Sequence, residues 1–97
     1  MNSCVVSQKA HQDIRELYEF GSQKFGKDQA LRYVEELNLY FQLLSQNPYL
    51  GRERSEIRKG LFSFPYTSHI LFYRIFKNHI RIVRVLHGSR DLNKYYK

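Results

Sequence analysis

The side chains of this sequence that could act on a nucleic acid gather in its second half. His87, Arg90 and Tyr95 lie near the end of the chain, and in principle they could supply a general base, a phosphate clamp and a proton donor. Further arginines lie in segments with strand character: Arg58, Arg74, Arg81 and Arg84. Because side chains alternate along a strand, Arg81 and Arg84 should face opposite sides of a sheet. The cluster that RNA cleavage needs is then incomplete, which favours binding over catalysis and leaves a ribonuclease as the alternative.

The charge of the chain is distributed unevenly. Residues 1–50 carry 5 Lys/Arg and 6 Asp/Glu, whereas residues 51–97 carry 11 Lys/Arg and 3 Asp/Glu. A half-molecule this basic favours an anionic partner, such as a nucleic acid, a ribosome or an acidic protein segment. The alternative is that basic strands only keep a small sheet soluble.

The composition excludes several classes of protein. A chain of 97 residues with 42% hydrophobic residues predicts one compact domain spanning residues 1–97. Cys4 is the one cysteine and the four histidines are scattered, so we expect no disulfide framework, metal or cofactor. No apolar stretch reaches the length of a membrane span, and the N-terminus becomes polar too early for a signal peptide. These features predict a cytoplasmic protein.

Two amphipathic helices are predicted in the first half. Ser7 is a good N-cap for the first helix, and Gly26 marks its end. Its apolar stripe is Ala10, Ile14, Leu17, Tyr18, Gly21 and Phe25. Asp28 can cap a second helix, which should stop before Asn47-Pro48. Its stripe is Ala30, Val34, Leu37, Phe41 and Leu44, and together the two helices predict an αα-hairpin.

The second predicted helix is apolar on two sides. Leu39 and Leu43 are one turn apart on the side away from the main stripe, beside Tyr40. Such a helix is either covered by another part of the chain or offers a surface to a partner. Covering by the loop at Tyr49-Leu50 and binding of a partner are equally open at this point.

After Pro48 the pattern becomes strand-like. Residues 56–59 could start a strand, and residues 60–64 lead into Pro65, which interrupts that strand or restricts it to an edge. Residues 69–76 and 80–86 should pair as a hairpin around a turn at 77–78, and Asp91 can cap a terminal helical turn. The order β-α-α-β-β-β predicts an α+β fold with a helical hairpin packed on one face of a mostly antiparallel sheet.

Five short motifs add to this pattern. They are S-x-x-A-x-x-D-I from Ser7, F-G-x-x-x-A from Phe25, N-P-x-L-G-R from Asn47, I-L-F-Y-R-I from Ile70 and R-V-L-H-G-S-R-D from Arg84. With the order of elements, they make the chain resemble the RelE/ParE superfamily of toxins from toxin–antitoxin systems, and its ParE branch in particular. The last motif also has a purely structural interpretation, as a strand end, a turn and a cap around a hydrogen-bonded histidine.

The superfamily contains two functional classes. The ribonuclease branch cleaves mRNA on the ribosome with basic side chains on the sheet. Laid on that pattern, the arginine position holds Ile70, and the two lysine positions fall on about Leu61 and Ser63. These residues cannot do the chemistry, so the resemblance to ParE implies a toxin that binds DNA gyrase and traps its DNA-cleaved complex. The candidate residues for contact with gyrase, or with DNA in the gyrase complex, are Arg58, Arg74, Arg84, His87 and Arg90.

The resemblance also implies an antitoxin partner. Family members are neutralised by a ParD-like antitoxin whose acidic C-terminal segment folds onto the toxin. The candidate contacts are Leu39, Tyr40, Leu43 and Tyr66, whereas Phe62 and Phe64 are expected mainly in the core. A hetero-oligomer of toxin and antitoxin follows. A third class also remains, a degenerate toxin that only binds its antitoxin and helps it to repress transcription.

Overall fold

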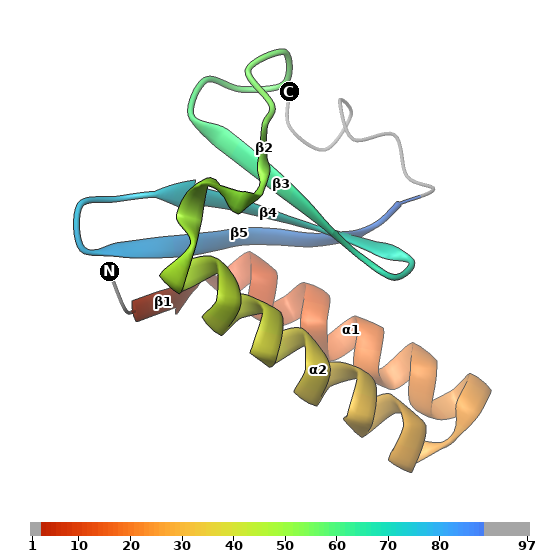
Figure 1. The fold of residues 1–97 in the computed structure, drawn as a ribbon. Helices are drawn as coiled ribbons and strands as arrows, with labels where there is room; N and C mark the ends of the chain where they lie inside the picture. The colour runs from red at the N-terminus through yellow and green to blue at the C-terminus, as the bar shows by residue number, and fades with distance from the viewer. Residues whose placement is uncertain (1–2, 89–97) are drawn as a thin grey trace.

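The computed structural model describes residues 3–88 and shows two helices packed on one face of a five-stranded sheet (Figure 1). The elements are β1 (Ser3–Val6), α1 (Gln8–Phe25), α2 (Lys27–Gln46), the 3₁₀ turn η1 (Pro48–Leu50), β2 (Arg52–Glu53), β3 (Leu61–Tyr66), β4 (His69–Ile75) and β5 (His79–His87). The strand order is β1-β5-β4-β3-β2, with β1 parallel to β5 and the other neighbours antiparallel. The predicted α+β fold is confirmed, and the predicted terminal turn at Asp91 lies outside the described residues.

The helix boundaries follow from two caps. The Ser7 hydroxyl accepts a hydrogen bond from the Ala10 N–H at 3.0 Å, as an N-cap does. Gly26 ends α1 with a φ of 94°, a conformation that favours glycine, and it also precedes α2. The prediction that Asp28 caps α2 was wrong, because the helix already begins at Lys27. Asp28 lies in the first turn, where its negative charge still stabilises the helix through the helix dipole.

The prediction of a strand at residues 56–59 was also wrong. The chain turns there, with the N–H groups of Ile57 and Arg58 both donating to the Arg54 carbonyl. The isoleucine packs onto the sheet instead of extending it. Pro65 does lie inside β3, opposite Ile70 of β4, and β2 pairs only with Phe62 and Ser63. The proline is thus on an exposed edge, where its missing N–H breaks no ladder.

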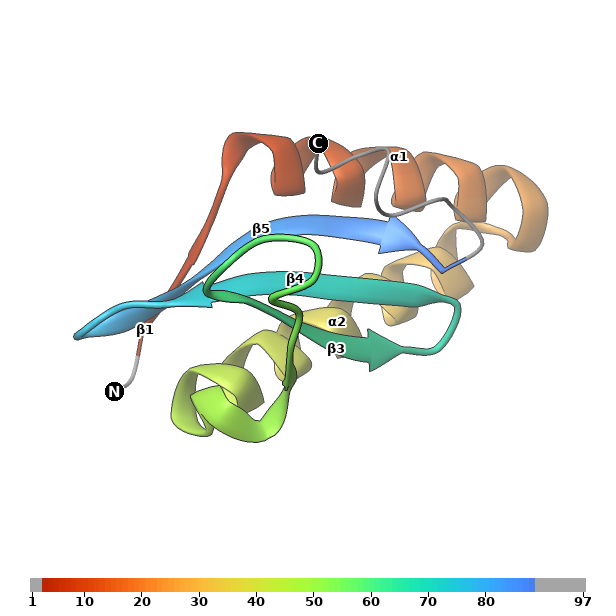
Figure 2. The same cartoon turned by 90° about the horizontal axis from the view of Figure 1, so that it is seen from above.

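The sheet has a core on each face. The larger core lies under the helices, where Leu37, Phe41 and Leu44 of α2 meet Tyr73 and Ile82. The smaller core lies on the other face, which we call the open face. It contains Leu61, Phe72 and Leu86 with Ile57, Ile70 and Val83 packed against them. The loop of residues 54–60 crosses over this face (Figure 2).

Candidate functional site

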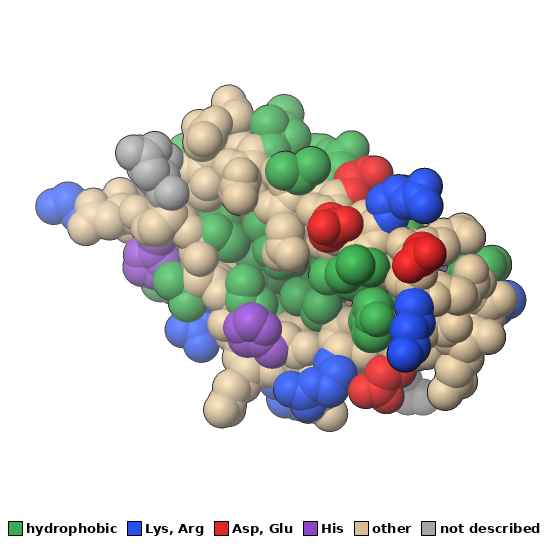
Figure 3. All heavy atoms as spheres, turned by 90° about the horizontal axis from the view of Figure 1, so that it is seen from below, with side chains coloured by type: hydrophobic (Ala, Val, Ile, Leu, Met, Phe, Trp, Pro, Cys, Tyr) green, Lys and Arg blue, Asp and Glu red, His purple; other side chains and the backbone are tan. Residues whose placement is uncertain are grey.

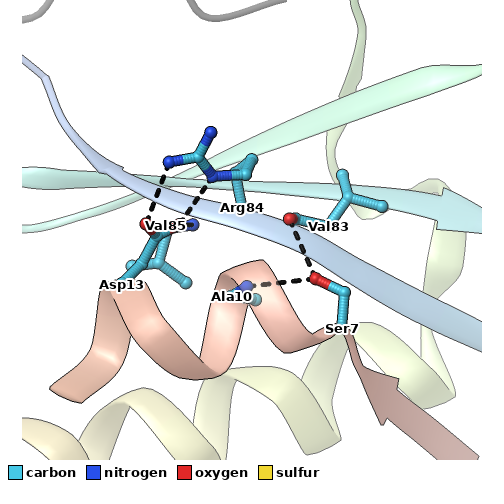
Figure 4. Close-up of polar contacts among 6 residues, drawn as sticks. All are labelled: Ser7, Ala10, Asp13, Val83, Arg84 and Val85. Carbon is cyan, nitrogen blue, oxygen red and sulfur yellow. Dashed lines mark hydrogen bonds and ion pairs between the residues drawn. The ribbon is translucent and has the colours of Figure 1, made fainter.

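The start of α1 closes the edge of β5 that β1 leaves uncovered. β1 pairs with β5 only as far as Ile82. Beyond it, the Ser7 hydroxyl donates to the Val83 carbonyl at 3.0 Å, and Asp13 accepts the Val85 N–H at 2.9 Å (Figure 4). The motif S-x-x-A-x-x-D therefore has a structural explanation. Its serine and aspartate form hydrogen bonds with successive backbone groups at the edge of β5 that would otherwise lack a partner strand.

Arg84 completes this anchor. Its guanidinium donates to both carboxylate oxygens of Asp13, at 2.8 and 3.0 Å. Both side chains are mostly buried, with exposed fractions of 16% for Arg84 and 12% for Asp13. Bidentate pairs of this kind are strong and geometrically specific. Arg84, a predicted target-binding residue, thus has a clear structural role.

A bulge in β5 changes where the arginines lie. Ile82 is opposite Tyr73 and Arg84 is opposite Phe72, so Val83 is an extra residue. In Figure 4 the side chains of Val83 and Arg84 both leave the side of β5 away from α1. The prediction that Arg81 and Arg84 face opposite sides was therefore wrong, because strict alternation fails at the bulge.

Several arginines share the open face. Arg74 is directly opposite both Leu61 of β3 and Arg81 of β5, and residues opposite each other in a sheet share a face. Arg74 also donates to the Lys59 carbonyl at 2.9 Å, and Arg58 is exposed in the same loop.

At the β2 end of the sheet, Arg52 and Arg54 line a shallow depression of about 360 Å³. The predicted residues Arg58, Arg74 and Arg84 thus lie on or above one basic face.

His87 lies on the opposite face. It is directly opposite His69, and their ring centroids are 5.3 Å apart. The His69 Nδ1 lies 2.8 Å from the hydroxyl of Tyr33 on α2, which also contacts Thr67. The fold therefore separates His87, a predicted target-binding residue and the base of the ribonuclease alternative, from Arg74 and Arg81. Arg90 and Tyr95, the other residues that a ribonuclease could use with His87, lie outside the described residues.

One histidine does share the face of the arginines. His79 is at the tip of the β4–β5 hairpin, where its ring stacks on Phe76 at a centroid distance of 4.9 Å. Sequence reasoning missed this pair, although the spacing of two residues in Phe76-Lys77-Asn78-His79 is typical of a tight hairpin turn.

The three positions compared with ribonuclease residues are unsuited to that chemistry. Leu61 is fully buried in the smaller core, and Ile70 packs against it. Ser63 is 5% exposed, and its hydroxyl accepts a hydrogen bond from Arg54 at 3.2 Å. None of the three can act as a cationic group on the open face.

A tyrosine holds the loop that follows α2. The buried Tyr73 hydroxyl donates to the Pro48 carbonyl at 2.6 Å and accepts the Gly51 N–H at 3.0 Å. A Cβ on Gly51 would overlap that hydroxyl and the Ser63 carbonyl oxygen, so the close approach requires glycine. Burial raises the pKa of Tyr73 and keeps the donor protonated. This contact links the N-P-x-L-G-R and I-L-F-Y-R-I motifs, and the sequence alone gave no signal for it.

The helical layer, which we define as α1, α2 and η1, exposes apolar side chains. Leu39 is 62% exposed and Leu43 is 39% exposed. Tyr49 is 77% exposed and Leu50 52%, so the loop does not cover the two leucines as the alternative required. Viewed from this side, apolar side chains gather across the middle of the molecule, and acidic and basic side chains mix toward one end (Figure 3). The second apolar side of α2 is therefore a surface.

The aromatic candidates divide between core and surface. Tyr40 is half-buried and its ring contacts Phe64 and Tyr66. Tyr66 is 2% exposed and donates to the Tyr33 carbonyl, so it offers no surface to an antitoxin in this structure. Phe62 and Phe64 pack against the larger core, as predicted.

Phe25 departs from the predicted stripe of α1. It is 57% exposed, and the Lys24 ammonium lies 5.5 Å from its ring centroid and from that of Phe20. The end of α1 extends beyond the sheet (Figure 1), so the Phe25 ring is not covered by a strand. Within residues 3–88, no helix is long and apolar enough to cross a membrane, and no three His, Cys, Asp or Glu side chains gather as a metal site.

Comparison with known proteins gives one family. Residues 5–92 match the model of the ParE toxin of the type II toxin–antitoxin system parDE. Toxin ParE1 of Mycobacterium tuberculosis is 34% identical over 91 residues, covering 93% of each chain. Toxin ParE1 of Caulobacter vibrioides is 30% identical over 86 residues, covering 89% of this chain and 88% of that one. A chain of the solved chromosomal ParDE system from P. aeruginosa has the same fold, with a TM-score of 0.78, 21% identity and coverage of 90% of this chain and 96% of its own.

Proposed function

Because the chain belongs to the ParE toxin family of type II toxin–antitoxin systems, we propose that it inhibits DNA gyrase by binding and trapping the DNA-cleaved complex. The observation that carries the proposal is the basic open face, on which Arg74 and Arg81 are directly opposite each other. A basic surface that includes Arg74 and Arg81 suits binding to gyrase or to its DNA. The toxin then acts in the cytoplasm by binding, without turnover of its own.

We further propose that a ParD-like antitoxin neutralises the toxin on the helical layer. Leu39 and Leu43 are exposed along α2, and the ring of Tyr40, also on α2, contacts Phe64 of β3. An amphipathic segment can place its apolar side chains on such a surface. The solved ParDE system of P. aeruginosa supports an antitoxin partner, and toxin and antitoxin would form a hetero-oligomer.

Purified gyrase provides the test. The toxin is added to supercoiling and DNA-cleavage reactions, and a parallel translation reaction is examined for cuts in the mRNA. We expect cleaved DNA to accumulate while the mRNA stays intact. Cut mRNA with unaffected gyrase would contradict the proposal and favour a ribosome-dependent ribonuclease. The base would then be sought first at His79, which shares the open face with Arg74 and Arg81.

A further inference from the structure

The tip of the β4–β5 hairpin combines an aromatic pair with a cationic pair on the open face. Phe76 and His79 flank the turn at Lys77-Asn78, and the Phe76 N–H donates to the His79 carbonyl at 2.8 Å. Their rings are stacked, with an interplanar angle of 10°. Ile75 and Ile80 come next and pair with each other. Because both isoleucines belong to the larger core, the aromatic pair projects from the open face.

The next pair of residues on the open face consists of two arginines. Arg74 and Arg81 are directly opposite each other, two residues from the aromatic pair, which is about 7 Å along the strands. Like charges directly opposite each other destabilise a sheet. No carboxylate of residues 3–88 forms an ion pair with either arginine. The two charges repel each other, and an anion bound here would relieve that repulsion.

The hairpin that ends in this tip is basic. Residues 69–88 contain four Lys or Arg and no Asp or Glu. Lys77 is exposed at the turn, and Phe76 is 42% exposed beside it. The tip lies at one end of the molecule in both ribbon views, so it can approach a partner without obstruction from the helices (Figures 1 and 2).

We propose that this tip binds a DNA strand end, with the Phe76–His79 pair stacking on the terminal base and Arg74, Lys77 and Arg81 holding the adjoining phosphates. Stacking on an aromatic ring tolerates any base, and cations spaced along a hairpin can follow a phosphate backbone. The inference rests on the proposed function, because a trapped cleavage complex is the state in which gyrase DNA has ends. The tip of the β4–β5 hairpin then contacts DNA rather than gyrase alone.

The test measures binding of the whole chain to a labelled duplex with a single-stranded overhang, at several salt concentrations. Phe76→Ala should weaken binding about tenfold and leave the salt dependence unchanged, whereas Phe76→Tyr should bind like the wild type. Arg81→Gln should lower the slope of log K against log salt by about one, because one phosphate contact is lost. It should also leave thermal stability unchanged or raised, since the like-charge pair is removed.

The helical layer supplies matched controls. Phe20→Ala removes a phenylalanine that is 63% exposed, and Arg32→Gln removes an exposed arginine of α2. Both should bind the DNA end like the wild type. Wild-type affinity of Phe76→Ala, or equal weakening by Phe20→Ala, would overturn the inference.

The gyrase assay separates this inference from the proposed function. If the wild type traps cleaved DNA and Phe76→Ala and Arg81→Gln lose potency, both stand. If these variants keep full potency and full affinity for DNA ends, the inference is wrong while gyrase poisoning stands. If the wild type leaves gyrase unaffected, the proposed function fails, and with it the role given to the tip.

Discussion

The helical layer and the open face of the sheet differ in what they present to solvent. Among residues 3–88, the helical layer carries seven of the nine exposed large apolar side chains: Phe20, Phe25, Leu31, Leu39, Leu43, Tyr49 and Leu50. The open face presents arginines instead, with Arg74 and Arg81 side by side. An apolar helix face suits a segment that folds onto it, and a basic sheet face suits an anion. One small domain can thus separate the contacts of two partners.

The largest effect is expected where the two regions are joined. Asp13→Ala should cost about 3–5 kcal/mol of unfolding free energy, because it leaves the mostly buried Arg84 charge without its carboxylate and the Val85 N–H without its acceptor. Urea unfolding followed by circular dichroism measures the change. Glu16→Ala, at an exposed acid of the same helix, should change stability by less than about 0.5 kcal/mol. A similar small loss for Asp13→Ala would contradict the anchor.

The second prediction concerns the turn that connects the helical layer to β2. Gly51→Ala should destabilise by about 1–3 kcal/mol, because the added methyl overlaps the Tyr73 hydroxyl and the Ser63 carbonyl oxygen. Thermal and urea unfolding measure this loss of unfolding free energy. Gly88→Ala is the control, since a Cβ there meets only ordinary contacts, 3.5 Å at the closest. Equal stability of the two variants would show that the close packing at Gly51 is dispensable.

The exposed leucines of α2 should matter for binding of the antitoxin and little for stability. Leu39→Lys should weaken antitoxin binding about tenfold, because it places a charge in the apolar part of the proposed interface. Its unfolding free energy should stay near that of the wild type, since Leu39 is 62% exposed. Calorimetric titration with the antitoxin measures the affinity, and Gln12→Lys on α1 introduces the same charge elsewhere. Unchanged affinity for Leu39→Lys would remove α2 from the interface.

The smallest effect is expected at β1, the strand that leads into α1. Burial raises the pKa of the Cys4 thiol from 9.0 to about 11. The unfolded chain ionises first, so the stabilisation is complete below pH 9 and is lost as the pH rises toward 11. Cys4→Ala should therefore lose less stability than the wild type across this range, as unfolding at several pH values would show. Parallel losses in both proteins would mean that the thiol has its ordinary pKa when folded.

The sequence predicted the elements better than their contacts. Apart from Phe25, which is exposed, the stripes of α1 and α2 follow from local periodicity and were confirmed, as were the cap at Ser7 and the β4–β5 hairpin. The strand expected at residues 56–59 was wrong, because the chain turns there and Ile57 packs onto the sheet instead of pairing in it. No local pattern distinguishes these two ways of burying one isoleucine.

The candidate site was predictable in kind but not in arrangement. The basic character of the second half was evident, whereas the convergence of Arg81 and Arg84 depends on the bulge at Val83. The burial of Tyr66 and the clamp by Tyr73 depend on residues distant in the chain, which spacing cannot reveal. Such features arise from tertiary packing, so they became visible only in the structure.

We propose that the open face acts on the target and that the helical layer binds the antitoxin. The most direct test compares two double variants, Arg74→Gln/Arg81→Gln and Leu39→Lys/Leu43→Lys, in gyrase cleavage and in antitoxin binding. The arginine variant should lose gyrase trapping and keep the antitoxin, and the leucine variant should do the reverse. The division into two binding faces would be contradicted if either variant, still folded, lost both activities. It would also be contradicted if both variants kept both activities.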